Sequence, residues 1–143
     1  MNNLNYYLYW TTLDGSSFIS GAVIEFDKDR SVHYSAPYKP TGVTIQSWKS
    51  HTTYWNSKSF PKLPLLIPGK EYQLDFDIEM DPKQSLFVKV RYFDRYKHDI
   101  GQEIVNSEGK IIQVPSNMYS YEISLLDFGN KSFKFKHIHL ASI

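Results

Sequence analysis

Residues 61–80, PKLPLLIPGKEYQLDFDIEM, decide the fold class of this chain. In the first half three prolines fix φ and withhold amide donors, and Pro68-Gly69 predicts a turn, since glycine supplies the positive φ that the second turn position needs. The second half alternates between apolar and polar side chains without a fault, from Tyr72 to Met80. A period of two places every apolar group on one side of a pleated strand. This segment therefore predicts an antiparallel strand with one buried and one hydrated face.

Short strands of this kind recur along the whole chain. Segments rich in alternating, β-branched and aromatic side chains, each bounded by turn residues, lie at 5–12, 17–26, 31–35, 43–48, 71–80, 85–93, 99–105, 110–115, 119–128 and 132–143. No stretch repeats apolar residues at helical spacing between helix caps, so helix content should be small. We predict an all-β chain: a single-domain antiparallel β-sandwich over residues 1–143, of the jelly-roll type.

The last predicted strand changes phase partway along its length. Phe133 and Phe135 share one face, whereas Ile138 and Leu140 follow in the opposite phase. Because the side-chain period of a strand is two, such a change indicates an extra residue in the strand or a strand that serves two packing surfaces. We therefore predict a β-bulge near Lys136-His137.

Composition and charge narrow the class of protein. The 143 residues carry a formal net charge of +1 and no cysteine. The small net charge argues against nucleic acid or an anionic membrane as a partner, and the lack of cysteine excludes disulfides, thiolate metal sites and a cysteine nucleophile. Residues 1–15 lack the basic and apolar regions of a signal peptide, and no apolar run approaches the length of about 18 residues that a spanning helix needs. We expect a soluble, cytosolic domain.

Three carboxylates, Asp75, Asp77 and Glu79, share the polar face of the strand at 71–80. Spaced at i, i+2 and i+4, they could form a glycosidase pair or a Ca²⁺ site. The alternative is a hydrated strand face that pairs with Lys89 and Arg91 on a neighbouring strand. We favour the alternative, since opposite charges on adjacent strands stabilise each other in this way.

Two histidines, His137 and His139, lie on one face of the last strand in an H-x-H pattern. That pattern can present two metal ligands, but the third would have to be His33, His51 or His98, and the spacing gives no reason to choose among them. We favour structural or solvent-facing histidines. No metal or other cofactor is expected, and no serine nucleophile motif is present.

The segment SWKSHTTYWNSKSF, residues 47–60, mixes flat rings with hydroxyl, amide and basic groups. Its candidate binding residues are Trp48, His51, Tyr54, Trp55 and Phe60. The mixture suits stacking against sugars, or a protein interface in which aromatic anchors supply the binding energy. Trp48 has a second interpretation, which we favour: it ends a strand and fills the interior of the sandwich. For Trp55 the two interpretations stay open.

Several motifs follow one another in an order that resembles a known family. They are G-x-V-I-x-F at 21–26, V-x-Y at 32–34, I-x-S-W-x-S at 45–50, L-P-L-L-x-P-G-x-x-Y at 63–72 and F-K-F-K-H-I-H-L at 133–140. Together they resemble the third accessory secretory protein family of the bacterial accessory Sec system. The resemblance covers residues 9–140, and SWKS and LPLLIPGKEY are its most specific parts.

The resemblance implies a β-sandwich similar to carbohydrate-binding modules and a non-enzymatic role. It also implies two partner accessory proteins in the cytosol of Gram-positive bacteria. Members of this family help a dedicated motor ATPase and translocon to export serine-rich-repeat glycoprotein adhesins, with glycosylation coupled to export. The motor ATPase, the adhesin substrate, its glycan and the translocon at the membrane are therefore further contacts that the resemblance implies.

Three functions are in competition. The first is an adaptor that works by protein–protein contact through residues 47–60 and through Lys89, Arg91 and Phe93. The second is a carbohydrate-binding module that stacks sugars on the aromatic rings of 47–60. The third is a small β-sandwich glycosidase or metal-dependent hydrolase, which would need converging carboxylates or three metal ligands. We favour the adaptor because the sequence shows no catalytic motif and no export signal, and carries an aromatic-rich segment.

Overall fold

The structure is a computed structural model that describes residues 4–10, 22–36, 42–50 and 63–143. Within these residues every regular element is a strand, so the predicted all-β class is confirmed. The strands are β1 (Asn5–Leu8), β2 (Val23–Phe26), β3 (Val32–Ser35), β4 (Thr44–Lys49), β5 (Glu71–Asp81), β6 (Leu86–Phe93), β7 (Asp99–Val105), β8 (Lys110–Gln113), β9 (Ser120–Asp127) and β10 (Ser132–Ser142).

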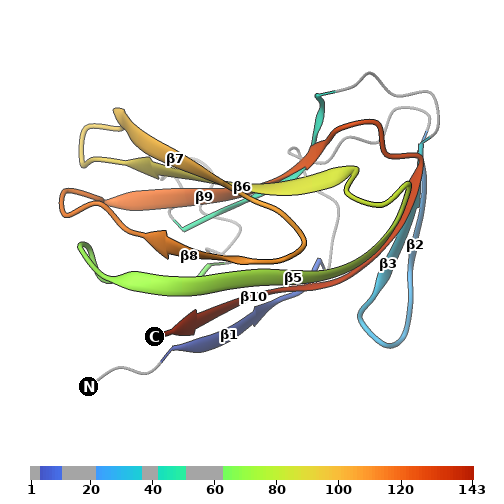
Figure 1. The fold of residues 1–143 in the computed structure, drawn as a ribbon, viewed down its shortest axis with the longest axis horizontal. Helices are drawn as coiled ribbons and strands as arrows, with labels where there is room; N and C mark the ends of the chain where they lie inside the picture. The colour runs from blue at the N-terminus through green and yellow to red at the C-terminus, as the bar shows by residue number, and fades with distance from the viewer. Residues whose placement is uncertain (1–3, 11–21, 37–41, 51–62) are drawn as a thin grey trace, which may run out of the picture.

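The strands form two antiparallel sheets that face each other (Figure 1). The larger sheet has the order β2-β3-β10-β5-β8, with β1 also paired to β10, and the smaller sheet has the order β4-β9-β6-β7. From β3 to β10 the chain changes sheet at every connection except the β6–β7 hairpin. Two sheets linked in this way make a jelly roll, so the predicted sandwich architecture is confirmed.

A cluster of aromatic rings fills the space between the sheets. Trp10 is 1% exposed. The ring centres that lie 6.0 to 6.3 Å from its own belong to Tyr34, Trp48, Phe133 and Phe135. Of these rings, Trp48 comes from the smaller sheet and the other three from the larger sheet. Large aromatic side chains bury more apolar surface than any others, so this cluster joins the two layers.

The predicted bulge is present in β10. The pairing of β10 with β5 shifts register between Phe135 and His137. On either side of the shift, Phe135, Ile138 and Leu140 are 0 to 1% exposed, although the first is in the opposite phase to the other two. The extra residue turns both halves of β10 toward the same core.

The predicted turn at Pro68-Gly69 is also present. Gly69 has φ of +84°, and the amide of Lys70 donates a 3.2 Å hydrogen bond to the carbonyl of Ile67. The amide of Ile67 in turn donates to the hydroxyl of Tyr72 at 2.8 Å. The hydrogen bond to Tyr72 thereby fixes the proline-rich segment to the start of β5. β5 ends at Asp81, one residue beyond the predicted strand.

One predicted pairing is wrong. Lys89 and Arg91 do not neutralise the acidic face of β5, because β6 lies in the smaller sheet and β5 in the larger. The neighbour of β5 is β10, and the ammonium of Lys136 in β10 lies 3.3 Å from the carboxylate of Glu79. Sequence alternation identifies the charged face of a strand, but the neighbour of that face depends on the strand order.

Glu103 links the two sheets through hydrogen bonds. Its Oε2 accepts the hydroxyl of Tyr92 at 2.6 Å and the amide of Gln113 at 3.1 Å, while its Oε1 lies 3.4 Å from the ammonium of Lys110. Glu103 and Tyr92 belong to the smaller sheet, whereas Gln113 and Lys110 belong to β8 in the larger. This carboxylate therefore holds β8 against the smaller sheet.

Three buried tyrosines should make the fold sensitive to alkali. Burial raises the pKa of Tyr34 to about 12. Burial, assisted for Tyr92 by its hydrogen bond to Glu103, raises the pKa of Tyr92 and Tyr121 further still. Unfolded tyrosines release their protons near pH 10, so the stabilisation is complete below pH 10 and falls as the pH rises above it.

We therefore expect unfolding and the ionisation of these tyrosines to occur together at alkaline pH. Absorbance at 295 nm and far-ultraviolet circular dichroism, followed in one pH titration, measure both events. If all eleven tyrosines of the sequence ionised near pH 10 while the strand signal persisted, the assigned burial would be incorrect.

Candidate interaction surface

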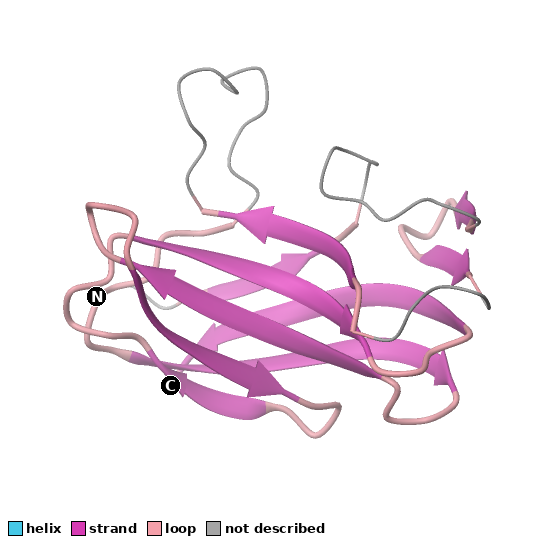
Figure 2. Ribbon diagram, turned by 90° about the horizontal axis from the view of Figure 1, so that it is seen from above, coloured by secondary structure: helices cyan, strands magenta, loops and turns pink. Residues whose placement is uncertain are grey.

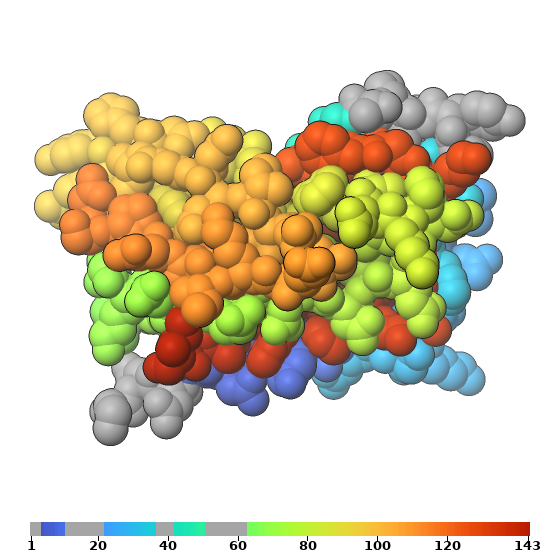
Figure 3. All heavy atoms as spheres, viewed as in Figure 1, coloured from blue at the N-terminus to red at the C-terminus, as the bar shows by residue number. Residues whose placement is uncertain are grey.

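Three of the predicted binding residues lie together on the outer face of the smaller sheet. Val88 and Val90 of β6 are fully buried, so the alternate residues Lys89, Arg91 and Phe93 point away from the core and are partly exposed. We call these three residues the outer strip. Figure 2 looks down on this sheet. In the space-filling view the upper outline of the molecule dips between the gold β6–β7 hairpin and the red segment after β9 (Figure 3).

Residues from the three neighbouring strands extend the outer strip sideways. One cross-strand row runs Lys49, Glu122, Arg91, Gln102, and the next runs Ser47, Ser124, Lys89, Ile104. The first row joins basic, acidic and amide groups. The second row joins two hydroxyl groups, of which that of Ser124 is buried, to Lys89 and to the exposed apolar side chain of Ile104. In the sequence, the residues of both rows alternate with apolar residues along their strands. Only the strand order shows that they lie side by side. Sequence reasoning therefore missed Glu122 and Gln102.

Arg91 is held in place by two contacts. Its Nη2 and Nε donate to Oδ2 of Asp99 at 2.9 and 3.2 Å, and its guanidinium carbon lies 5.2 Å from the ring centre of Phe93. The hydrogen bond from Arg91, followed by one from the amide of Gly101, lowers the pKa of Asp99 below its usual value. The guanidinium is oriented, and a planar fork of donors suits a carboxylate or a backbone carbonyl of a partner.

Lys89 differs from Arg91 in its ion pairing. Within the described residues its ammonium makes no ion pair, while Arg91 is paired with Asp99. The residue directly opposite it on β9 is Ser124, whose hydroxyl lies 3.0 Å from that of Ser47 and donates to Glu122. Lys89 is thus a cation beside a network of hydroxyl groups, available to an external acidic group.

The charged stretch at 91–99 organises the hairpin between β6 and β7. Asp94 accepts the amides of Tyr96 and His98 at 2.8 and 2.9 Å and lies 3.1 Å from Nδ1 of His98. These hydrogen bonds, that of the His98 amide first, lower the pKa of Asp94. Tyr96 at the tip is 72% exposed. The carboxylate of Asp94 therefore supports the turn, and the ring of Tyr96 is exposed to solvent at the tip of the hairpin.

The remaining predicted binding residues come from 47–60. Trp48 is 4% exposed, and its ring lies 5.6 Å from that of Phe135 and 6.3 Å from that of Trp10. A ring packed in this way offers no face to a sugar or a protein, so its assignment as a binding residue is corrected. The favoured interpretation of Trp48, as a residue that fills the sandwich, is right. His51, Tyr54, Trp55 and Phe60 lie outside the described residues.

The H-x-H pair lies on the outer face of the larger sheet. The ring of Tyr7 stacks on His139 with centres 4.4 Å apart and meets His137 edge-on at 5.0 Å. Nε2 of His139 contacts Asn5, and its Nδ1 lies 3.4 Å from the carboxylate of Asp75. In the ranges that the structure describes, no three histidine or carboxylate side chains gather where they could hold a metal ion. Both imidazoles are used in contacts within the sheet.

Comparison with known proteins decides the family. Residues 17–142 match the family described as Accessory Sec secretory system ASP3. The chain belongs to the ASP3 family. It is 30% identical over 145 residues to the accessory Sec system protein ASP3 of Streptococcus gordonii, an alignment that covers 95% of this chain and 91% of that protein. The resemblance found in the sequence is confirmed.

Solved structures agree with this assignment. A chain from the crystal structure of accessory secretory proteins 1, 2 and 3 of Streptococcus pneumoniae superposes with a TM-score of 0.88 at 29% identity, covering 96% of this ASP3-family chain and 95% of that chain. A chain of the glycosylation-associated Gap123 complex of Streptococcus agalactiae also gives 0.88, at 31% identity, with 96% of this chain and 44% of that one covered. The ASP3-family chain thus spans less than half of the Streptococcus agalactiae chain.

A more distant match concerns the fold alone. A carbohydrate-binding module of family 4 superposes with a TM-score of 0.50 at 14% identity, covering 90% of the ASP3-family chain and 81% of the module. The predicted similarity to such modules is therefore right for the sandwich. Among the described residues there is no helix long and apolar enough to cross a membrane.

Replacing Arg91 by Met should change the stability of the fold little. The two side chains of its ion pair with Asp99 are 35% and 43% exposed, and pairs of that exposure contribute about 0 to 1 kcal/mol. The expected change in the free energy of unfolding, measured with urea, is less than about 1 kcal/mol. A decrease of more than about 2 kcal/mol in the free energy of unfolding would mean that Arg91 is needed for the stability of the sheet.

Proposed function

We propose that this chain is a non-enzymatic adaptor subunit of the accessory Sec system, which assembles with two other accessory secretory proteins in the cytosol and takes part in the export of serine-rich-repeat glycoprotein adhesins. The observation that carries the proposal is the likeness of almost the whole chain to a subunit of a solved assembly of accessory secretory proteins 1, 2 and 3. The Gap123 complex supports it in the same way. In this role the chain contributes binding surface and carries out no reaction.

The outer strip is the surface that we assign to a partner. It offers Lys89, a cation that forms no ion pair with any residue that the structure describes, an oriented guanidinium at Arg91 and an aromatic ring at Phe93 on a central strand. Arginine and aromatic side chains are enriched where protein interfaces are energetically important, and a rigid strand loses little entropy when it binds. The partner surface that fits this strip is acidic, with carboxylates placed for Lys89 and for the free edge of the Arg91 fork.

Reversing one charge tests the assignment. Lys89→Glu should weaken the complex with the two accessory proteins at least tenfold, since an acidic partner surface would then face a carboxylate. Lys28→Glu is the matched control, because Lys28 is exposed in the turn between β2 and β3 of the larger sheet. The measurement is the dissociation constant from biolayer interferometry with the co-purified partners immobilised.

Equal affinity for Lys89→Glu, Lys28→Glu and the unaltered chain would remove the outer strip from the interface. Circular dichroism and a urea titration of each variant separate this result from misfolding. A loss of affinity for both variants alike would indicate a non-specific electrostatic effect, and the outer strip would again lose its role.

Glycan binding through exposed aromatic rings is the second candidate function. With Trp48 in the core, it depends on Tyr54 and Trp55. The adaptor role predicts that Trp55→Ala weakens co-purification with the partner proteins while the chain shows no saturable response to N-acetylglucosamine. Saturable binding of the sugar, measured by calorimetry and abolished by Trp55→Ala, would establish glycan binding. Unchanged co-purification of a folded Trp55→Ala variant would remove that residue from the protein interface.

A further inference from the structure

Strand β5 is covered unevenly along its two sides. On one side it pairs with β10 from Tyr72 to Asp81. On the other side β8 covers only the first part, from Glu71 to Leu74. Within the described residues no strand pairs with the rest of that side, 75–81, which we call the open edge. Figure 1 shows β8 running beside only part of β5.

The open edge begins just beyond Leu74, which pairs with Lys110, the first residue of β8. The turn that precedes β8 contains Gly109, which has φ of +83°. A Cβ on Gly109 would lie 3.1 Å from Cβ of Asp75 and 3.2 Å from the carbonyl oxygen of Leu74. The backbone of the turn therefore crosses close to β5 at Asp75. Beyond that point no strand of the described ranges pairs with the open edge, and an edge of this kind is a template for another strand.

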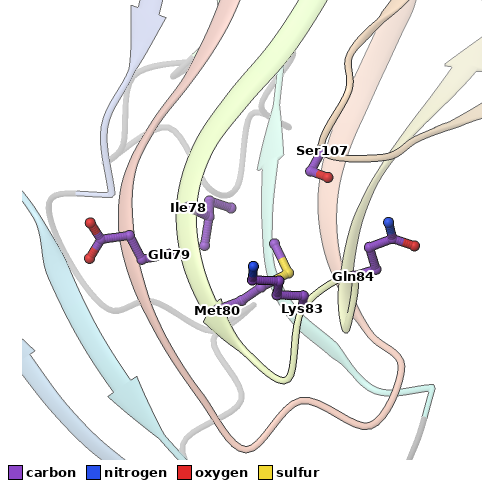
Figure 4. A pocket seen from close by; sticks show the side chains of 6 residues that line it. All are labelled: Ile78, Glu79, Met80, Lys83, Gln84 and Ser107. Atoms are coloured by element: carbon purple, nitrogen blue, oxygen red, sulfur yellow. The ribbon is translucent and has the colours of Figure 1, made fainter.

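A pocket of about 370 Å³ adjoins the open edge. It is lined by Ile78, Glu79, Met80, Lys83, Gln84 and Ser107. Figure 4 shows Ile78 and Met80 pointing from β5 toward the gap, with Ser107 and Gln84 on its far side. Ile78 and Met80 are partly buried and pack against the core, so the pocket gives an apolar side chain access to the inner layer of the sandwich.

Charge distinguishes the outer side of the open edge. Four carboxylates, Asp75, Asp77, Glu79 and Asp81, occupy alternate positions there. Asp75 lies 3.4 Å from His139, and Glu79 lies 3.3 Å from Lys136. Asp77 is exposed and forms no ion pair within the described residues. A strand laid along the open edge would therefore meet negative charge on its outer side.

We propose that the open edge of β5 accepts an extended segment of a partner polypeptide as an added strand, in line with β8. Alternate side chains of the segment would be apolar and enter the pocket of Ile78 and Met80, and those between them would be basic and face Asp77. Strand addition obtains affinity from the main-chain hydrogen bonds and specificity from alternate side chains. A second copy of this chain is a poor occupant, since two open edges would place like charges opposite each other.

A synthetic peptide tests the proposal directly. The probe is an eight-residue peptide of alternating lysine and valine, acetylated and amidated at its ends, titrated into the ¹⁵N-labelled full chain. We expect saturable shifts of the amide resonances of 75–80 and of Ser107, with the outer strip unaffected. A peptide in which serine replaces valine should bind at least fivefold more weakly, because its side chains have no apolar contact in the pocket.

Two matched variants test whether the peptide binds at the open edge or only responds to negative charge on β5. Asp77→Lys should raise the dissociation constant of the lysine–valine peptide at least fivefold. Glu71→Lys makes the same charge change on the same strand, where β8 covers it, and should leave the constant within twofold. The absence of saturable shifts, equal binding of the serine peptide, or equal effects of the two variants would overturn the proposal. Shifts at 75–80 that grow with protein concentration alone would also overturn it, since the occupant would then be a second copy.

Discussion

The bulge in β10 is the constraint on which the rest of the sandwich depends. β10 pairs with β5 along its whole length, with β3 at its start and with β1 at its end, so it is the hub of the larger sheet. Without the register shift after Phe135, either that ring or Ile138 and Leu140 would point to water, because a shift of one residue reverses every later side chain. The bulge lets both halves of the hub pack on one core.

The two sheets are then joined by specific polar contacts as well as by the aromatic core. The carboxylate of Glu103 holds β8 to the smaller sheet, and the buried hydroxyl of Tyr121 donates to the carbonyl of Pro64 in the proline-rich segment. β8 begins directly after the Gly109 turn, which crosses β5 at Asp75. Among the described residues, residues 75–81 of β5 therefore have a neighbouring strand only on the β10 side. The outer strip lies on the smaller sheet and the open edge on the larger, so the two proposed contacts use separate surfaces.

Much of this fold could be predicted from local pattern, because strand phase depends on nearest neighbours along the chain. The alternation before Met80, the Pro68-Gly69 turn and the phase change in β10 each have a local physical cause, and each is present. The partner of the acidic face of β5 depends on strand order, a long-range property, and Lys89 was assigned to it incorrectly. Trp48 illustrates the same limit, since an aromatic residue at a strand end can face inward or outward.

The most direct test of the adaptor account is whether the unaltered chain enters a complex. The chain would be co-expressed with the two other accessory secretory proteins of its own organism and analysed by size-exclusion chromatography with light scattering. The account predicts one peak that contains all three polypeptides and whose mass exceeds that of any pair. Elution of a folded chain by itself, at its monomer mass of 16.7 kDa and with both partners in other fractions, would contradict it.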